Sequence, residues 1–176
     1  MPTRLCLDLN VWLGAILSQG LGRTDTAAQM LVAAARSGAS ARGPVALVIS
    51  WGMLNRLREV LTRFDFGREE ADRLVEVIAA IARDGPSLTL GGVGVLPLDD
   101  EEDRHVLETA LAGGADLLVT HNLADFMGAD VTVLVEGRWL AAARGDRRLL
   151  IAHTYAAAGW LRGEDWPEAV AGFVTG

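Results

Sequence analysis

Short apolar, β-rich runs alternate with longer helical patterns along this chain, and that alternation constrains the fold more than any other feature. The runs expected to form strands are 4–9, 45–50, 116–120 and 131–137. The segments with a helical period are about 24–36, 51–63, 68–84, 100–112 and 147–161. Strands separated by helices indicate an α/β domain with a mostly parallel central sheet.

The length of 176 residues, 51% of them hydrophobic, suits a single domain with a substantial core. We expect its main part at 1–140, with 141–176 as a C-terminal helical extension packed on the same domain. No apolar run approaches the ~20 residues that span a bilayer, so no membrane association is expected. The start is a poor signal peptide, and the lone Cys6 fits a reducing compartment, so we expect a cytoplasmic protein.

All 16 basic residues are arginine, and the absence of lysine excludes several chemistries. Without a lysine the chain cannot form a Schiff base with a substrate, and it has no Walker lysine to contact phosphates. The net charge of −7 argues against indiscriminate coating of DNA, which uses broad positive fields. Local arginine clusters still allow nucleic acid as a partner.

Polar residues follow the predicted strands where a parallel sheet would collect them. Ligands of such sheets bind outside the carboxyl ends of the strands. The residues expected to gather at that edge are Asp8, Asn10, Ser50, Thr120, His121 and Asn122. Asp8 lies inside the apolar stretch "LCLDLNVWL", where a charge is costly unless it is paired or bound to a cation. A turn cap at the end of the strand is the alternative reading.

Five acidic residues in a row, 99–103, precede the helical pattern at 100–112. Asp99 and Asp100 suit the cap of that helix, and Glu101 and Glu102 are expected to face solvent. The helical phase sets Asp103 near the centre of the apolar stripe, because it lies three and four residues before Val106 and Leu107. An inward carboxylate in a first helical turn needs a cation or a donor.

The remaining acids and histidines are less distinctive. Asp116 opens its strand, so a structural cap at the far edge is expected. Asp125, in "THNLADF", could be an ordinary turn residue or part of the site. The histidines lack the spacing of a metal pair, and His105 is expected to be solvated. Oxygen ligands from distant segments suit Mg²⁺ or Mn²⁺.

These segments resemble the PIN-domain family. "LDLNVWL" is similar to its first motif, and "DEEDRHVLETALAGGADLLVTHNLADF", 100–126, is similar to its paired later motifs. "VISWGMLNRLREVL", 48–61, resembles the segment between them. The resemblance covers about 4–136 and implies a three-layer α/β/α fold and an Mg²⁺- or Mn²⁺-dependent ribonuclease. Toxins of the virulence-associated protein C type, which a partner antitoxin inhibits, belong to this family.

Residue by residue, Asp8 and Asp103 match two of the four acids of the family, and two positions depart. Arg56 stands where the family usually has Glu, and Glu59 lies on the wrong side of that helix to replace it. Asn122 stands at the last family acid, and Asp125 would then supply the charge, directly or through water. A guanidinium in place of a carboxylate weakens cation binding, forms an Arg–carboxylate bridge or contacts a phosphate.

The leading hypothesis is a divalent-metal-dependent endoribonuclease, the toxin of a toxin–antitoxin pair. Asp8, Asp103 and Asp125 would bind the metal, Asn122 would complete the site, and Thr120 would fix its loop. Asn10, Ser50 and Arg56 would support substrate binding. The alternative is a weakened or inactive PIN-like module that binds RNA or a protein. A phosphatase of the haloacid-dehalogenase type would need an acid at Asn10 and a lysine. A homodimer is expected because exposed tryptophans often mark interfaces.

Overall fold

The computed structural model describes residues 1–64, 66–82, 101–128, 130–144 and 147–175, and only the backbone of 101–103 and 144. The first half of the chain contains β1 (Thr3–Leu7), α1 (Leu9–Gly20), α2 (Ala27–Ser37), β2 (Ala39–Ser40), β3 (Gly43–Val48), α3 (Trp51–Arg63) and α4 (Arg68–Ile81). The second half contains α5 (Glu101–Ala112), β4 (Leu117–Thr120), the 3-10 helix η2 (Leu123–Phe126), β5 (Val131–Val135), β6 (Trp139–Arg144), β7 (Arg147–His153), α6 (Thr154–Leu161) and α7 (Glu168–Thr175).

The strands of the described residues form one seven-stranded sheet in the order β2-β3-β1-β4-β7-β6-β5. Its four central strands, β3, β1, β4 and β7, are parallel, and the outer pairings are antiparallel. The expected α/β class with a mostly parallel centre is therefore confirmed. β1 has β3 on one side and β4 on the other, so the chain connections reverse direction there, which is where such sheets bind ligands.

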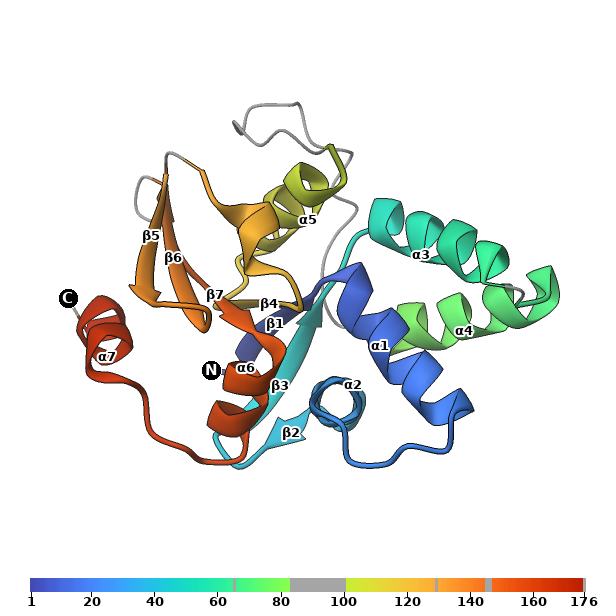
Figure 1. The fold of residues 1–176 in the computed structure, drawn as a ribbon, viewed down its shortest axis with the longest axis horizontal. Helices are drawn as coiled ribbons and strands as arrows, with labels where there is room; N and C mark the ends of the chain where they lie inside the picture. The colour runs from blue at the N-terminus through green and yellow to red at the C-terminus, as the bar shows by residue number, and fades with distance from the viewer. Residues whose placement is uncertain (65, 83–100, 129, 145–146, 176) are drawn as a thin grey trace.

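Helices cover both faces of the parallel centre, so its strands are buried on both sides (Figure 1). Leu5, Cys6 and Leu7 of β1 and Leu118 and Val119 of β4 are fully buried. α1, α2 and α6 lie on one side of the sheet, and α5 lies on the other (Figure 1). The continuous apolar character of these strands is therefore explained by burial from two sides rather than by alternation.

Local capping explains several element boundaries. Thr26 caps α2 in a capping box with Gln29, and Ser50 caps α3 by accepting a hydrogen bond from Met53 N. Gly38 ends α2 in the left-handed conformation, at φ 67°. The helices predicted at 24–36, 51–63, 68–84 and 100–112 correspond to α2, α3, α4 and α5.

Two of the predicted segments differ in kind from the expectation, and β2, β6 and α7 form where no element was predicted. The strand predicted at 4–9 ends at Leu7, and Asp8 caps a helix, α1, that the apolar pattern did not distinguish from a strand. Residues 147–161 are not one helix, because 147–153 form β7 and only 154–161 form α6. The run "LLIA" is buried between β4 and β6, and periodicity cannot separate such a short buried strand from a helical segment. The division of the chain near residue 140 stays a prediction.

The end of α5 depends on close contact between Gly113 and β3. A Cβ at position 113 would lie 2.3 Å from Val48 Cγ1 and 3.0 Å from the Thr109 carbonyl oxygen. Val48 is buried and β-branched, so it has little freedom to move away. We expect Gly113→Ala to lower the free energy of unfolding by about 1–3 kcal/mol, measured by urea denaturation.

The matched control is Gly172→Ala in α7, where a Cβ would meet nothing within 4 Å. Alanine favours a helix over glycine, so this change should be neutral or slightly stabilising. Equal urea midpoints for the two variants would contradict the packing argument.

Among the described residues, no helix has the length and apolar character needed to cross a membrane.

Candidate functional site

Asp8 sits at the carboxyl end of β1 and is 5% exposed. Its Oδ1 accepts a hydrogen bond from Leu9 N at 2.6 Å, which caps α1. Its Oδ2 accepts from Thr120 Oγ1 at 2.8 Å and from Asn10 Nδ2 at 2.7 Å. Among the described residues, Oδ1 thus receives a single hydrogen bond and keeps acceptor capacity for a further partner.

Thr120 joins the neighbouring strand to this carboxylate. Its hydroxyl is fully buried at the end of β4, donates to Asp8, and accepts from Asn10 Nδ2 and Asn122 N, each at 3.0 Å. Asn10 Oδ1 in turn accepts from His121 N at 3.0 Å. The structure therefore brings together Asp8, Asn10, Thr120 and the start of the loop after β4, as the strand topology suggested.

The pKa of Asp8 lies above its ordinary value, chiefly because burial disfavours the charged carboxylate. Hydrogen bonds from Thr120 and Leu9 lower this pKa, and the charge of Asp125 raises it. A nearby cation would relieve both the burial cost and the repulsion. Burial also raises the pKa of the adjacent Cys6 thiol, so this cysteine is an inert core residue.

Asp125 lies in η2, the short helix that follows β4. Asn122 caps η2 through its Oδ1, which accepts from Ala124 N at 3.3 Å, and its Nδ2 donates to Asp125 Oδ1 at 2.6 Å. Asn122 therefore fixes the orientation of the Asp125 carboxylate. The charge of Asp125 raises the pKa of Asp8, so the two acids lie close enough to interact electrostatically.

Asp103 lies in the first turn of α5, and its side chain is outside the described residues, as are Asp99, Asp100 and the side chains of Glu101 and Glu102. The amino end of α5 reaches the carboxyl edge of the sheet, because His105 Nε2 lies 3.3 Å from Ser50 Oγ, directly after β3. His105 is half-buried here, so the expectation of a solvated histidine is wrong. The helical phase could not reveal that α3 packs against this side of α5.

Ser50 serves as a buried cap of α3 and accepts a hydrogen bond from Thr109 Oγ1 at 3.1 Å. Its described hydrogen bonds join α3 to α5 and do not reach Asp8. Asp116, at the opposite edge, accepts from Arg4 N at 2.8 Å, which fits a structural role.

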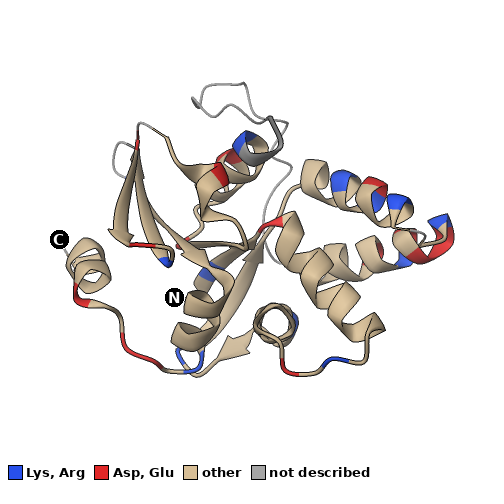
Figure 2. Cartoon of the chain, viewed as in Figure 1, with Lys and Arg blue, Asp and Glu red and all other residues tan. Residues whose placement is uncertain are grey.

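Arg56 lies on α3 and pairs with Glu59, whose Oε2 is 3.0 Å from Arg56 Nη1. Arg58 lies 3.6 Å from Asp72 of α4. Basic and acidic residues alternate along α3 and α4 (Figure 2), so this surface is mixed rather than purely positive. Arg147 and Arg148 donate to the carbonyls of Leu111 and Phe173.

A histidine pair extends the site toward β7. His121 Nδ1 lies 2.8 Å from Thr154 Oγ1, and that hydroxyl donates to the Thr120 carbonyl at 3.1 Å. When the hydroxyl donates to the Thr120 carbonyl, it can accept from His121 only if the histidine carries a proton on Nδ1. Burial, and next the electrostatic effect of His153, lower the pKa of His121, which favours its neutral form.

His153 and Tyr155 were not among the candidate residues, because 147–161 was expected to be helical. His153 ends β7 and pairs in register with Thr120 of β4. The β-rich run before a polar Thr-Tyr pair was the signal that could have identified this strand end.

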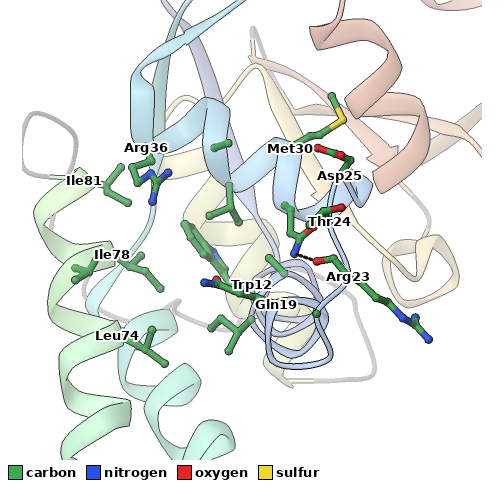
Figure 3. Close-up of a pocket in the computed structure, with 17 residues that line it drawn as sticks. Trp12, Gln19, Arg23, Thr24, Asp25, Met30, Arg36, Leu74, Ile78 and Ile81 are labelled. Carbon is green, nitrogen blue, oxygen red and sulfur yellow. Dashed lines mark hydrogen bonds between the residues drawn. The ribbon is translucent and has the colours of Figure 1, made fainter.

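A cavity of about 540 Å³ lies between α1, α2 and α4 (Figure 3). Apolar side chains such as Ile16, Met30 and Ile78 form much of its wall. Trp12 lines it and is almost fully buried, and its Nε1 has no hydrogen-bond partner among the described residues. Asp8, Asn10 and Thr120 do not line this cavity.

Within the described side chains, no group of three Asp, Glu, His or Cys residues is arranged to hold a metal. Asp8 and Asp125 supply two carboxylates, and Asp103 is the third acid expected from the sequence. The chemistry of these two carboxylates fits a hard divalent cation, because both offer oxygen ligands and Asp8 keeps acceptor capacity.

Comparison with protein families places this chain among proteins with a nuclease-type α/β fold. A family model described as "PIN domain" matches residues 4–124, well over half of the chain. The chain belongs to the PIN-domain family. PIN domains are commonly ribonucleases and are typically dependent on divalent metals. Comparisons with curated proteins and with solved structures give no match.

Proposed function

We propose that this protein is a divalent-metal-dependent endoribonuclease that hydrolyses phosphodiester bonds in RNA. The observation that carries the proposal is the buried Asp8 carboxylate, held by Thr120 and Asn10 at the carboxyl edge of a PIN-domain sheet. A buried carboxylate with a raised pKa is typical of a site whose charge is completed by a ligand.

Asp8, Asp125 and Asp103 would hold Mg²⁺ or Mn²⁺, with Asn122 at the remaining family position. When bound, such a cation activates water and stabilises the charge that develops on a phosphate undergoing hydrolysis. Thr120 and Asn10 orient Asp8 through hydrogen bonds, and Asn122 orients Asp125. Ser50 supports the site indirectly, by fixing α3 against α5.

The second candidate function is a weakened or inactive PIN-like module that binds RNA or a protein. Arg56 favours it, because this arginine stands on α3 where the family usually has Glu and pairs with Glu59. Arg56, together with Arg58 and Arg63 of the same helix, would contact phosphates in either function.

We also propose a cytoplasmic toxin role with a cognate antitoxin and a homodimeric state. The apolar cavity between α1, α2 and α4 supports a protein partner, because it offers surface that another chain could cover. Trp51, which is 53% exposed, supports a further interface. Trp12 and Trp139 are buried and offer no such surface.

The test is incubation of the purified protein with a panel of RNAs in Mn²⁺ or Mg²⁺, read by gel electrophoresis. We expect site-selective cleavage that a chelator stops and that Asp103→Asn abolishes. Asp165→Asn is the matched control, because Asp165 is fully exposed and pairs only loosely with Arg42, at 3.6 Å. Cleavage that ignores the chelator and survives Asp103→Asn would overturn the proposal. Metal-independent RNA binding without cleavage would favour the module.

A further inference from the structure

Tyr155 forms an open aromatic surface at the same edge of the sheet as Asp8. It follows directly after the first residue of α6, is 74% exposed, and stacks on His153 with ring centroids 5.4 Å apart and planes 23° apart. His153 is itself anchored, because it caps α6 through Nδ1 and its backbone N–H donates to the Arg138 carbonyl at 2.9 Å. One face of the tyrosine ring is therefore supported and the ring remains accessible.

The position of this stack relates it to Asp8. His153 pairs with Thr120, and Thr120 donates to Asp8, so two strand spacings, about 10 Å, separate the backbone at His153 from the backbone at Asp8. A few nucleotides of an extended single strand cover that span. Arg138, exposed on the turn between β5 and β6, brings a positive charge to the same edge.

We propose that the His153–Tyr155 stack is a base-binding platform that holds an unpaired base of the RNA at the sheet edge that carries Asp8. This inference rests on the proposed nuclease function and names a residue pair that would bind its RNA. Bases stack on aromatic side chains only where they are unpaired and free of their neighbours, as in single strands, loops and bulges. The net charge of −7 limits affinity for the phosphate backbone, so base stacking has to supply much of the binding.

The chain offers a direct spectroscopic test, because Tyr155 is its single tyrosine. Protein labelled with 3-fluorotyrosine should give one ¹⁹F resonance, which a short single-stranded RNA in EDTA should shift. The same backbone with abasic residues should leave the resonance in place, as should a duplex of the same sequence. An equal shift with the abasic strand would show that phosphates, not bases, cause the change, and would overturn the platform.

Binding and cleavage of the same RNA separate this inference from the proposed function. We expect Tyr155→Leu to raise Kd in EDTA, and KM in Mn²⁺, by about tenfold with kcat little changed, while Tyr155→Phe binds as wild type. Phe64→Leu is the matched control, because Phe64 is 54% exposed but lies at the far end of α3.

The possible outcomes are distinct. Cleavage with an unchanged Kd in Tyr155→Leu overturns the platform and leaves the nuclease standing. Binding through Tyr155 without cleavage supports the platform and overturns the nuclease. The absence of any RNA binding overturns the platform. An equal loss of RNA binding in Phe64→Leu would show that the effect is not specific to Tyr155 and would overturn the platform as well.

Discussion

Asp8→Asn is expected to reduce metal-dependent RNA cleavage by more than about 100-fold and to abolish the rise in melting temperature that Mn²⁺ produces. Losing even a residue that only orients a metal ligand costs about 10–100-fold, so losing a ligand itself should cost more. Asparagine caps helices as well as aspartate does, so α1 should persist. Cleavage assays and thermal denaturation with and without Mn²⁺ measure the two effects.

The pH dependence of metal-free stability provides a second readout. Because the folded pKa of Asp8 is raised, its favourable contribution is complete below the unfolded pKa and is lost as pH rises through the folded pKa. Above that pKa, metal-free Asp8→Asn should therefore gain stability relative to wild type. The Mn²⁺-induced rise in the wild type should grow over the same pH range, since the cation binds the ionised form.

Asp165→Asn should change neither the cleavage nor the Mn²⁺ response, because its carboxylate is fully exposed and distant from the site. A full Mn²⁺ response in Asp8→Asn would show that the cation binds elsewhere. That result would favour the inactive PIN-like binding module over the metal-dependent nuclease.

Thr120→Val is expected to lower the free energy of unfolding by about 1–3 kcal/mol and cleavage by about 10–100-fold. Valine has nearly the same shape but removes the hydroxyl that donates to Asp8 and accepts from Asn10 and Asn122. The buried carboxylate would lose a donor, which raises its pKa further and shifts the acid limb of the pH–rate profile upward. Urea denaturation and a pH–rate profile measure these changes.

Two variants control for this substitution. Thr120→Ser keeps the hydroxyl and should retain the pH–rate profile of the wild type. Thr132→Val, at an exposed position of β5, should change stability by less than about 0.5 kcal/mol. A Thr120→Val protein with an unaltered acid limb would show that this hydroxyl does not set the protonation of Asp8.

Much of the candidate site could be predicted from strand ends alone. Asp8 and Thr120 lie 112 residues apart, yet each directly follows or ends a short buried run, and parallel strands bring such ends together. The central parallel strands β1, β3 and β4 have apolar sequences for the same reason, because both of their faces are buried. Whether these residues bind a metal stays a prediction that the proposed experiments address.

Other features depended on packing partners that a local pattern does not contain. The apolar run in β7 is equally compatible with a buried helix, and only its position between β4 and β6 makes it a strand. His105 has polar neighbours in sequence, but the contact between α3 and α5 places it against Ser50. Local periodicity measures which side of an element is apolar and says nothing of which element covers it.

The sequence by itself determined the α/β class, the acids at the strand ends and the exclusion of lysine chemistry, because these follow from composition and from the apolar period. Only the tertiary structure decided the burial and raised pKa of Asp8, the central position of the Thr120 hydroxyl and the place of Tyr155 on the same edge. The physical reason is that desolvation and hydrogen bonding depend on neighbours more than 100 residues away, which the sheet register brings into contact.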